Sequence, residues 1–199
     1  PTHFGHGLIC NSLYPLVNGK TLVILPKPDI NTAIHLGSVI DKYRITFMSS
    51  VPSIWHLVLK VSKRPVGQTL QQIHIGSAPL SSELWTKVSD WSGTKRVWNT
   101  YGITETGSWV AGPVADQEPL PYDGYIGQGW GAEIIVVPTG SEPINCTSFY
   151  PLNEGERGDV WVKTPDVMAG YMNRQAETDK VLQCNWFRTG DIGYIMKNN

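Results

Sequence analysis

The stretch from Asn99 to Glu105 (Asn-Thr-Tyr-Gly-Ile-Thr-Glu) gathers side chains that nucleotide chemistry uses. The aromatic face of Tyr101 can stack on a purine base, and Gly102 lets the backbone approach a ligand closely. The Thr104 hydroxyl can donate to a phosphate oxygen, and the Glu105 carboxylate can hold Mg²⁺. On residue types alone, the alternative is an ordinary turn after a buried strand, in which Tyr101 packs and Glu105 is a solvated charge.

No other arrangement of residues predicts a catalytic nucleophile or a zinc site. The sequence has no Ser-His-Asp arrangement and no Cys-His pair at nucleophile spacing. His35 and His56 fall on expected helices, where surface exposure or packing is the default. The three cysteines are odd in number, far apart and without a CxxC pair, which argues against a disulfide scaffold. We therefore expect reduced thiols and a cytoplasmic location.

Composition excludes several classes of partner. With 16 Lys and Arg against 17 Asp and Glu, the net charge is −1, so neither nucleic acid nor an anionic membrane is an expected partner. The 41% hydrophobic and 10% aromatic content, with eight Trp, indicates a folded chain. No stretch approaches the roughly 18 uninterrupted apolar residues of a membrane span.

Strands and helices alternate over residues 1–112, which predicts an α/β subdomain with a mainly parallel sheet covered by helices. The expected helices begin near Asp29 with Ala33, Leu36, Ile40 and Tyr43 on one face, at Pro52, and after a Ser81 cap. The expected strands of this part are 21–25, 46–49, 72–75 and 97–99.

Residues 113–199 have a different texture and predict a small β-barrel-like subdomain. The segment 113–158 is rich in Gly and Pro. Short runs at 133–137, 160–163 and 194–196 read as strands divided by turns, which favours a β-rich architecture over more α/β. The expected division into two parts therefore falls between residues 112 and 113.

Five segments, in this order along the chain, resemble signatures of the adenylate-forming (AMP-binding) superfamily. This superfamily contains acyl-CoA and aryl-CoA synthetases, luciferase and the adenylation domains of nonribosomal peptide synthetases. The segment 99–105 is the most characteristic of the five. The others are 1–8 (PTHFGHGL), 76–80 (GSAPL), the pair 155–160 (GERGDV) and 167–171 (VMAGY), and 186–191 (WFRTGD). Together they cover essentially the whole chain, which resembles an internal part of the large domain of such an enzyme.

The resemblance implies how the adenine base of ATP would be bound. Tyr101 would stack on the base, and Asn99 would reach its exocyclic amine. Ser77 and Ala78 would contact the base through their backbone on the opposite side.

It likewise implies residues for the phosphates, the metal and the ribose. Thr104 would bind the α-phosphate and Glu105 would coordinate Mg²⁺. Asp191 would accept hydrogen bonds from the ribose hydroxyls, a role suited to an ionised carboxylate. Gly190 is typical of a tight turn that would let Asp191 face the sugar.

The implied reaction is attack of a carboxylate on the α-phosphate of ATP, giving an acyl-adenylate and pyrophosphate, followed by displacement of AMP by a thiol. The turn at 76–80 favours coenzyme A as the thiol, and the alternative is the phosphopantetheine arm of a carrier protein. An alternative of another class is a non-catalytic module that binds nucleotide or acyl groups. The pair Thr104 and Glu105 argues against it, because such a module needs no magnesium carboxylate.

The family's acid pocket corresponds here to six residues, from which we expect a short or aromatic acid rather than a long fatty acid. They are His6, His74, Gly76, Thr100, Ser108 and Trp109. Gly76 would leave room beside its strand, Trp109 would fill the far end, and the imidazoles would hydrogen-bond a polar or ring-bearing acid. The alternative is that Trp109 packs into the core and the histidines bond backbone groups.

Two parts of the family pattern lie outside this sequence. One is the Ser/Thr/Gly-rich phosphate loop expected upstream of residue 1. The other is the mobile C-terminal domain with its lysine, since Lys197 sits in no such motif and reads as a surface charge. We therefore expect an excised fragment that is inactive alone, although its complete parent would be an enzyme.

Overall fold

The computed structural model describes residues 5–25, 29–114, 122–142 and 150–196. Residues 1–4 of the first signature segment, Cys146 and Lys197 lie outside the described residues. The chain divides into two compact units. Unit 1 comprises Pro1–Thr104 and Ala111–Gln128, and unit 2 comprises Glu105–Val110 and Gly129–Asn199.

Unit 1 is built on three parallel strands, β1 (Phe47–Ser50), β2 (Gln72–Gly76) and β3 (Val97–Gly102). In the register of these strands, Ser49 pairs with His74, and His74 pairs with Trp98. The short strands β4 (Trp109–Gly112) and β5 (Gln128–Gly129) complete the sheet order β1-β2-β3-β4-β5. Parallel strands with helical crossovers confirm the predicted α/β architecture.

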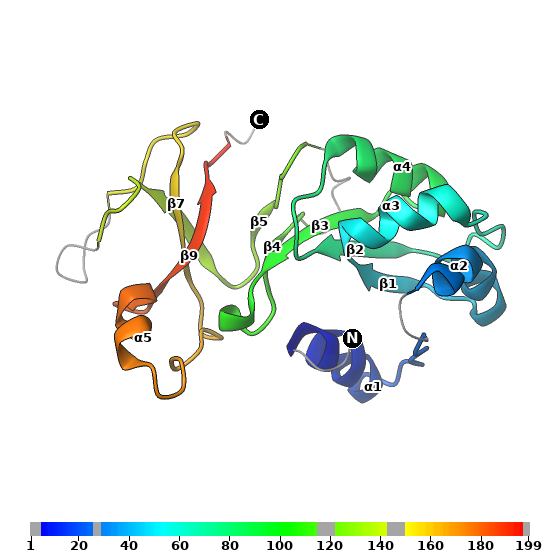
Figure 1. Ribbon diagram of the computed structural model, residues 1–199, viewed down its shortest axis with the longest axis horizontal. Helices are drawn as coiled ribbons and strands as arrows, with labels where there is room; N and C mark the ends of the chain where they lie inside the picture. The colour runs from blue at the N-terminus through cyan, green and yellow to red at the C-terminus, as the bar shows by residue number, and fades with distance from the viewer. Residues whose placement is uncertain (1–4, 26–28, 115–121, 143–149, 197–199) are drawn as a thin grey trace. The chain divides into compact units, whose positions relative to one another are not determined.

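Three helices cover one face of this sheet: α2 (Ile30–Tyr43), α3 (Pro52–Val61) and α4 (Ser82–Ser92) (Figure 1). Their starts follow the sequence signals. The Asp29 carboxylate accepts from Thr32 N at 2.9 Å, Pro52 opens α3, and Ser81 Oγ accepts from Leu84 N at 3.2 Å. Each cap satisfies or removes a backbone donor that would otherwise lack a helical partner.

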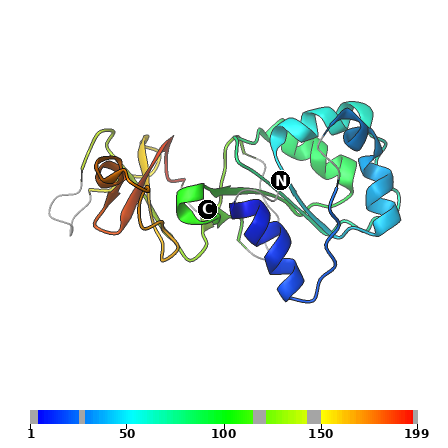
Figure 2. The same ribbon diagram turned by 60° about the horizontal axis from the view of Figure 1, so that its bottom comes forward.

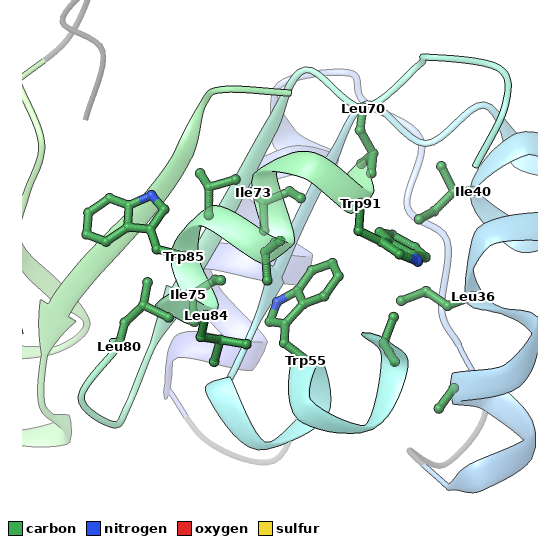
Figure 3. Packing of buried hydrophobic residues seen from close by; sticks show 14 residues of the cluster. Leu36, Ile40, Trp55, Leu70, Ile73, Ile75, Leu80, Leu84, Trp85 and Trp91 are labelled. Atoms are coloured by element: carbon green, nitrogen blue, oxygen red, sulfur yellow. The ribbon is translucent and has the colours of Figure 1, made fainter. Parts of the chain in front are cut away.

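The core of unit 1 lies between these helices and the sheet (Figure 3). Trp55 and Trp91 meet edge to face with ring centroids 5.5 Å apart, and the Trp55 indole N–H donates to Ser50 Oγ at 2.6 Å. The buried members are Ala33, Leu36, Ile40, Trp55, Val58, Leu70, Ile73, Ile75, Leu80, Leu84, Trp85, Val88, Trp91 and Val97. Such a core holds the strands, and hence their carboxyl ends, in fixed register.

The opposite face of the unit 1 sheet meets the N-terminal segment, formed by η1 (His6–Leu13), a π-helix, and α1 (Tyr14–Val17) (Figures 1 and 2). Alternation along a strand sends Ile73 and Ile75 into the helix-covered core and leaves Gln72 and His74 on this second face. The second face is therefore where polar groups of the strands gather.

Unit 2 is a four-stranded antiparallel sheet in the order β6-β7-β9-β8, with a short helix, α5 (Gln175–Val181). Its strands are β6 (Glu133–Val137), β7 (Gly158–Lys163), β8 (Leu182–Gln183) and β9 (Trp186–Gly193). The buried apolar residues are fewer than in unit 1, namely Val110, Val136, Val137, Val160, Trp161, Val162 and Phe187. This sheet confirms the predicted β-rich second part.

Several expected elements were wrong. Residues 21–25 form no strand, and Ile24 is largely exposed, because an apolar run needs a paired neighbour to become a strand. The last strand is β9, not 194–196, and the WFRTGD segment lies within it. Gly190, expected at a tight turn, lies in β9 where its pairing with β7 is irregular. Tyr43 is half exposed instead of inward-facing, with Lys42 over its ring. The elements η1, α1, α5, β4, β5 and β8 were not anticipated.

Candidate functional site

The segment 99–105 comprises the carboxyl-terminal part of β3 and the residues that follow it, up to the boundary of unit 1 after Thr104. Asn99 is buried, and its amide nitrogen donates to the Tyr125 carbonyl at 2.7 Å. Any contact of Asn99 with an amine would therefore use its side-chain oxygen. Tyr101 is half-buried, and Thr104, in the short 3₁₀ helix η2 (Thr104–Thr106), is exposed.

The turn that begins at Ser77 follows β2, which lies beside β3 because Gly76 pairs with Thr100. Ser77 and Ala78 are exposed, and Ser77 has φ of +66°, a left-handed conformation that an L side chain rarely adopts. A Cβ on Gly76 would lie 2.6 Å from the Thr100 carbonyl oxygen. Gly76 thus permits close contact between strands, and the room expected beside it is filled by the buried Thr100.

Glu105 belongs to unit 2 and has partners there that sequence reasoning missed. The Tyr171 hydroxyl donates to Glu105 Oε1 at 2.8 Å, and Met168 N donates to the Glu105 carbonyl at 2.7 Å. The hydrogen bond to Glu105 raises the pKa of the Tyr171 phenol, because the carboxylate favours the protonated donor. The residues lie 66 positions apart, so only the fold brings them together.

Asp191 is exposed on β9, directly after Gly190 with φ of +82°. The backbone N–H of Asp191 donates to Thr189 Oγ1 at 3.1 Å, and that hydroxyl donates to the Val160 carbonyl at 2.9 Å. This irregular part of β9 is therefore anchored to β7. The buried Asp159 of β7 forms an ion pair with Arg188 at 2.5 Å.

His6 and His74 come together on the second face of the unit 1 sheet. His6 Nε2 is 3.0 Å from Ser49 Oγ, and Ser49 is the register partner of His74 on β1. Burial lowers the pKa of His6. Burial also lowers the pKa of His74 to about 3, helped by the charge on His6. His74 is therefore neutral at pH 7.

The His74 ring is packed in a stack of aromatic and polar neighbours. It stacks on Trp98 with centroids 5.2 Å apart, and the edge of Phe47 approaches it at 5.0 Å. Gln72 Nε2 lies 2.5 Å from its Nε2. With 6% of its surface exposed, His74 contributes to the interior of this face more than to an open pocket wall.

Sequence reasoning missed Phe47, Ser49, Gln72 and Trp98 as neighbours of the histidines. The period-two spacing of Gln72 and His74 was the available signal. Of the predicted pocket residues, His6, His74, Gly76 and Thr100 belong to unit 1, and Ser108 and Trp109 belong to unit 2. Both of the latter are half-buried.

Two observations concern metals and cysteines. Within the described residues, no three or more His, Cys, Asp or Glu side chains gather as a metal cluster. Cys184 is disulfide-bonded, whereas Cys10 is a thiol outside any disulfide, so the expectation of three reduced thiols was wrong. It failed because sequence separation does not reveal which cysteines are close in space.

The comparisons with known proteins identify the family. The family model described as AMP-binding enzyme matches residues 1–172. The chain therefore belongs to the AMP-binding enzyme family, as the resemblance of its signature segments predicted.

Its relatives include acid–CoA ligases and luciferase. A probable CoA ligase of Humulus lupulus is 29% identical over 96% of this chain and 34% of its own length. Luciferin 4-monooxygenase of Nipponoluciola cruciata is 31% identical over 98% of this chain and also 34% of its own length. The chain thus spans about one third of the relatives that it matches.

Solved structures share the fold. A benzoate CoA ligase of Burkholderia xenovorans aligns with a TM-score of 0.81 and 20% identity, over 100% of this chain and 38% of that one. O-succinylbenzoate coenzyme A synthetase of Bacillus subtilis, in complex with ATP and magnesium ion, aligns with a TM-score of 0.77 and 24% identity, over 99% and 38%. Helices suited to crossing a membrane are absent from the described part of the chain.

Proposed function

We propose that the complete protein to which this chain belongs activates a carboxylic acid with ATP, forming an acyl-adenylate, and passes the acyl group to coenzyme A. One observation carries the proposal. The segment 99–105 leaves β3 with Thr104 exposed, and it ends in Glu105, whose carboxylate is held by Tyr171. The family and the CoA ligases among the relatives support this reading, and CoA is the favoured acceptor over a carrier-protein arm.

Nucleotide binding would use residues from the ends of β2, β3 and β9. We assign the adenine base to Tyr101, to the side-chain oxygen of Asn99, and to the backbone of Ser77 and Ala78. The exposed Asp191 would accept hydrogen bonds from the ribose hydroxyls. None of these roles needs a general base, because the reaction joins two anions and depends on positioning and charge neutralisation.

The residues near the phosphates fit a magnesium-bound nucleotide. Glu105 Oε1 accepts from Tyr171, and a carboxylate has a second oxygen able to bind a hard cation. A bound Mg²⁺ would supply charge neutralisation at the phosphates. Thr104 would donate its hydroxyl to the α-phosphate, and the substrate phosphates would complete the coordination of the cation.

The acid would lie near the second face of the unit 1 sheet, close to His6, and we propose a short or aromatic acid. Because the pKa of both imidazoles is lowered, His6 and His74 would offer neutral hydrogen-bonding groups to a polar substituent. The family resemblance also assigns Ser108 and Trp109, in unit 2, to acid binding. Since Thr100 fills the space beside Gly76, selection for acid size would fall to His6 and Trp109.

Pyrophosphate exchange by the complete protein tests the function, with acetate, benzoate and palmitate as acids. We expect Mg-ATP-dependent exchange with acetate or benzoate, a changed preference in Trp109→Ala, and no exchange by the 199-residue chain alone. Preference for palmitate that Trp109→Ala leaves unchanged would show that the pocket is misplaced. Exchange by the isolated chain would contradict the need for the parts outside it.

The cytoplasmic location remains a prediction, and one feature argues against it. Disulfides persist mainly in oxidising compartments, and Cys184 is disulfide-bonded. Alkylation of free thiols in protein taken directly from its source would decide between a reducing and an oxidising compartment. Three reactive thiols would support a reducing compartment, and one would support an oxidising compartment.

A further inference from the structure

A hydrogen-bonded connection joins Glu105 to a loop far along the chain, entirely within unit 2. The Tyr171 hydroxyl donates to one carboxylate oxygen of Glu105 at 2.8 Å, and Met168 N donates to the Glu105 carbonyl at 2.7 Å. Both Glu105 and Tyr171 are half-buried. The segment 168–171 therefore holds both the backbone and the side chain of Glu105.

The backbone of Tyr171 is bound to α5 through Thr178. Its backbone N–H donates to Thr178 Oγ1 at 2.9 Å, and that hydroxyl donates to the Arg174 carbonyl at 3.0 Å. Thr178 is buried. Gly170 has φ of +148°, and a Cβ there would lie 3.0 Å from Thr178 Cγ2, so the approach of the loop to α5 depends on a residue without a side chain.

The two oxygens of the Glu105 carboxylate differ, because Oε1 accepts from the Tyr171 phenol. Oε2 is the oxygen that we assign to a bound cation. A freely rotating carboxylate loses rotamer freedom when it binds a metal, whereas one fixed beforehand loses less. Groups that hydrogen-bond a metal-binding side chain typically change metal affinity 10-fold to 100-fold when they are removed.

We propose that Tyr171 is a positioning residue that fixes the Glu105 carboxylate for the Mg²⁺ of bound ATP, with Thr178 as its support. This inference rests on the proposed role of Glu105. It adds a residue outside the 99–105 segment to the residues that serve magnesium binding. It also assigns a function to α5, an element that the sequence did not predict.

The test measures ATP affinity of the complete protein by calorimetry, once with Mg²⁺ and once with EDTA. Tyr171→Phe removes only the hydroxyl. We expect it to weaken ATP binding about 10-fold in Mg²⁺ and to leave the affinity in EDTA unchanged. Thr178→Val, which removes the support, should give the same pattern with a smaller factor. Tyr194→Phe, a phenol of the same unit that contacts Arg157 through its ring, is the matched control and should change neither affinity.

The outcomes separate this inference from the proposed function. Equal weakening in Mg²⁺ and EDTA would show that Tyr171 supports only the fold, and unchanged affinity in both would show that it does nothing for the metal. Either result overturns the inference. A wild-type protein that binds ATP more tightly with Mg²⁺ but exchanges no pyrophosphate would contradict the proposed function alone. A protein that binds no Mg-ATP would contradict both.

Discussion

The two units hold their candidate residues by different means. In unit 1, Asn99 lies within β3 and Ser77 follows the carboxyl end of the adjacent parallel strand β2, and a large tryptophan-rich core fixes the positions of both strands. In unit 2, Glu105 and Asp191 are held by individual hydrogen bonds and by a left-handed glycine, over a smaller core. Placement by packing is collective, whereas placement by hydrogen bonds depends on single atoms.

Removing a central side chain from the core of unit 1 should have the largest effect. Trp55→Ala is expected to lower the free energy of unfolding by about 4 kcal/mol, because it removes a fully buried indole and leaves a cavity. Denaturant unfolding followed by circular dichroism measures the change. Tyr43→Ala, at a half-exposed ring of the same unit, should cost less than about 1 kcal/mol. Similar costs at both positions would contradict placement by collective packing.

In unit 2, the largest effect should appear in catalysis and not in stability. Glu105→Gln in the complete protein is expected to lose about 3 kcal/mol of transition-state stabilisation, roughly two orders of magnitude in kcat/KM. The melting temperature should barely change, since the carboxamide oxygen can still accept from Tyr171. Pyrophosphate exchange and thermal unfolding measure the two quantities. Wild-type turnover in the variant would show that Glu105 has no role in catalysis.

The same contrast explains what could be predicted from the sequence. In unit 1, the three central strands followed from apolar runs, and Ser81 and Pro52 start helices as expected from capping signals. The strand at 21–25 and the inward-facing Tyr43 were exceptions. The pairing of Tyr171 with Glu105 did not follow, because a hydrogen bond across 66 residues leaves no local pattern. The aromatic stack around His74 was missed for a related reason, since it depends on the register of three strands.

Signature segments named candidate residues but did not describe their surroundings. Gly76 is an example, because its role as open space was inferred from its size. The fold shows that Thr100 occupies that space. Unit 2 was harder to predict than unit 1. Its strands are short and separated by turns, and β9 coincides with a signature segment for which the sequence predicted no strand.

Acidification should affect unit 1 through His74. The pKa of His74 is about 3 in the folded protein, below the ordinary value of 6.5, so the unfolded state binds its proton first. Stability should therefore fall as pH drops from 6.5 towards 3, by about 2 kcal/mol between pH 7 and pH 5.

The pH effect is measured as the difference between the wild type and His74→Gln. Unfolding free energies at several pH values should show a steeper acid decline in the wild type. His35→Gln, at an exposed imidazole on α2, is the control and should keep the wild-type slope. Parallel curves for the wild type and His74→Gln would mean that His74 does not stay neutral when it is buried.

The smallest expected effects concern two left-handed positions at or beside candidate residues, Gly190 and Ser77. Gly190 has φ of +82° and open space at its Cβ position, so Gly190→Ala should cost about 1 kcal/mol through the backbone alone. Gly131, at φ of +66° with the same open space, is the matched control in unit 2 and should lose similar stability. Only Gly190→Ala should also weaken ATP binding, because it moves the neighbouring Asp191. Equal ATP affinities for Gly190→Ala and Gly131→Ala would show that Gly190 does not position Asp191 for the nucleotide.

Ser77 is the opposite case in unit 1, because its side chain already lies on a residue in the left-handed region. Ser77→Gly should relieve that strain and raise the melting temperature slightly. The gain in the free energy of unfolding should stay below about 1 kcal/mol, because glycine gains entropy in the unfolded chain.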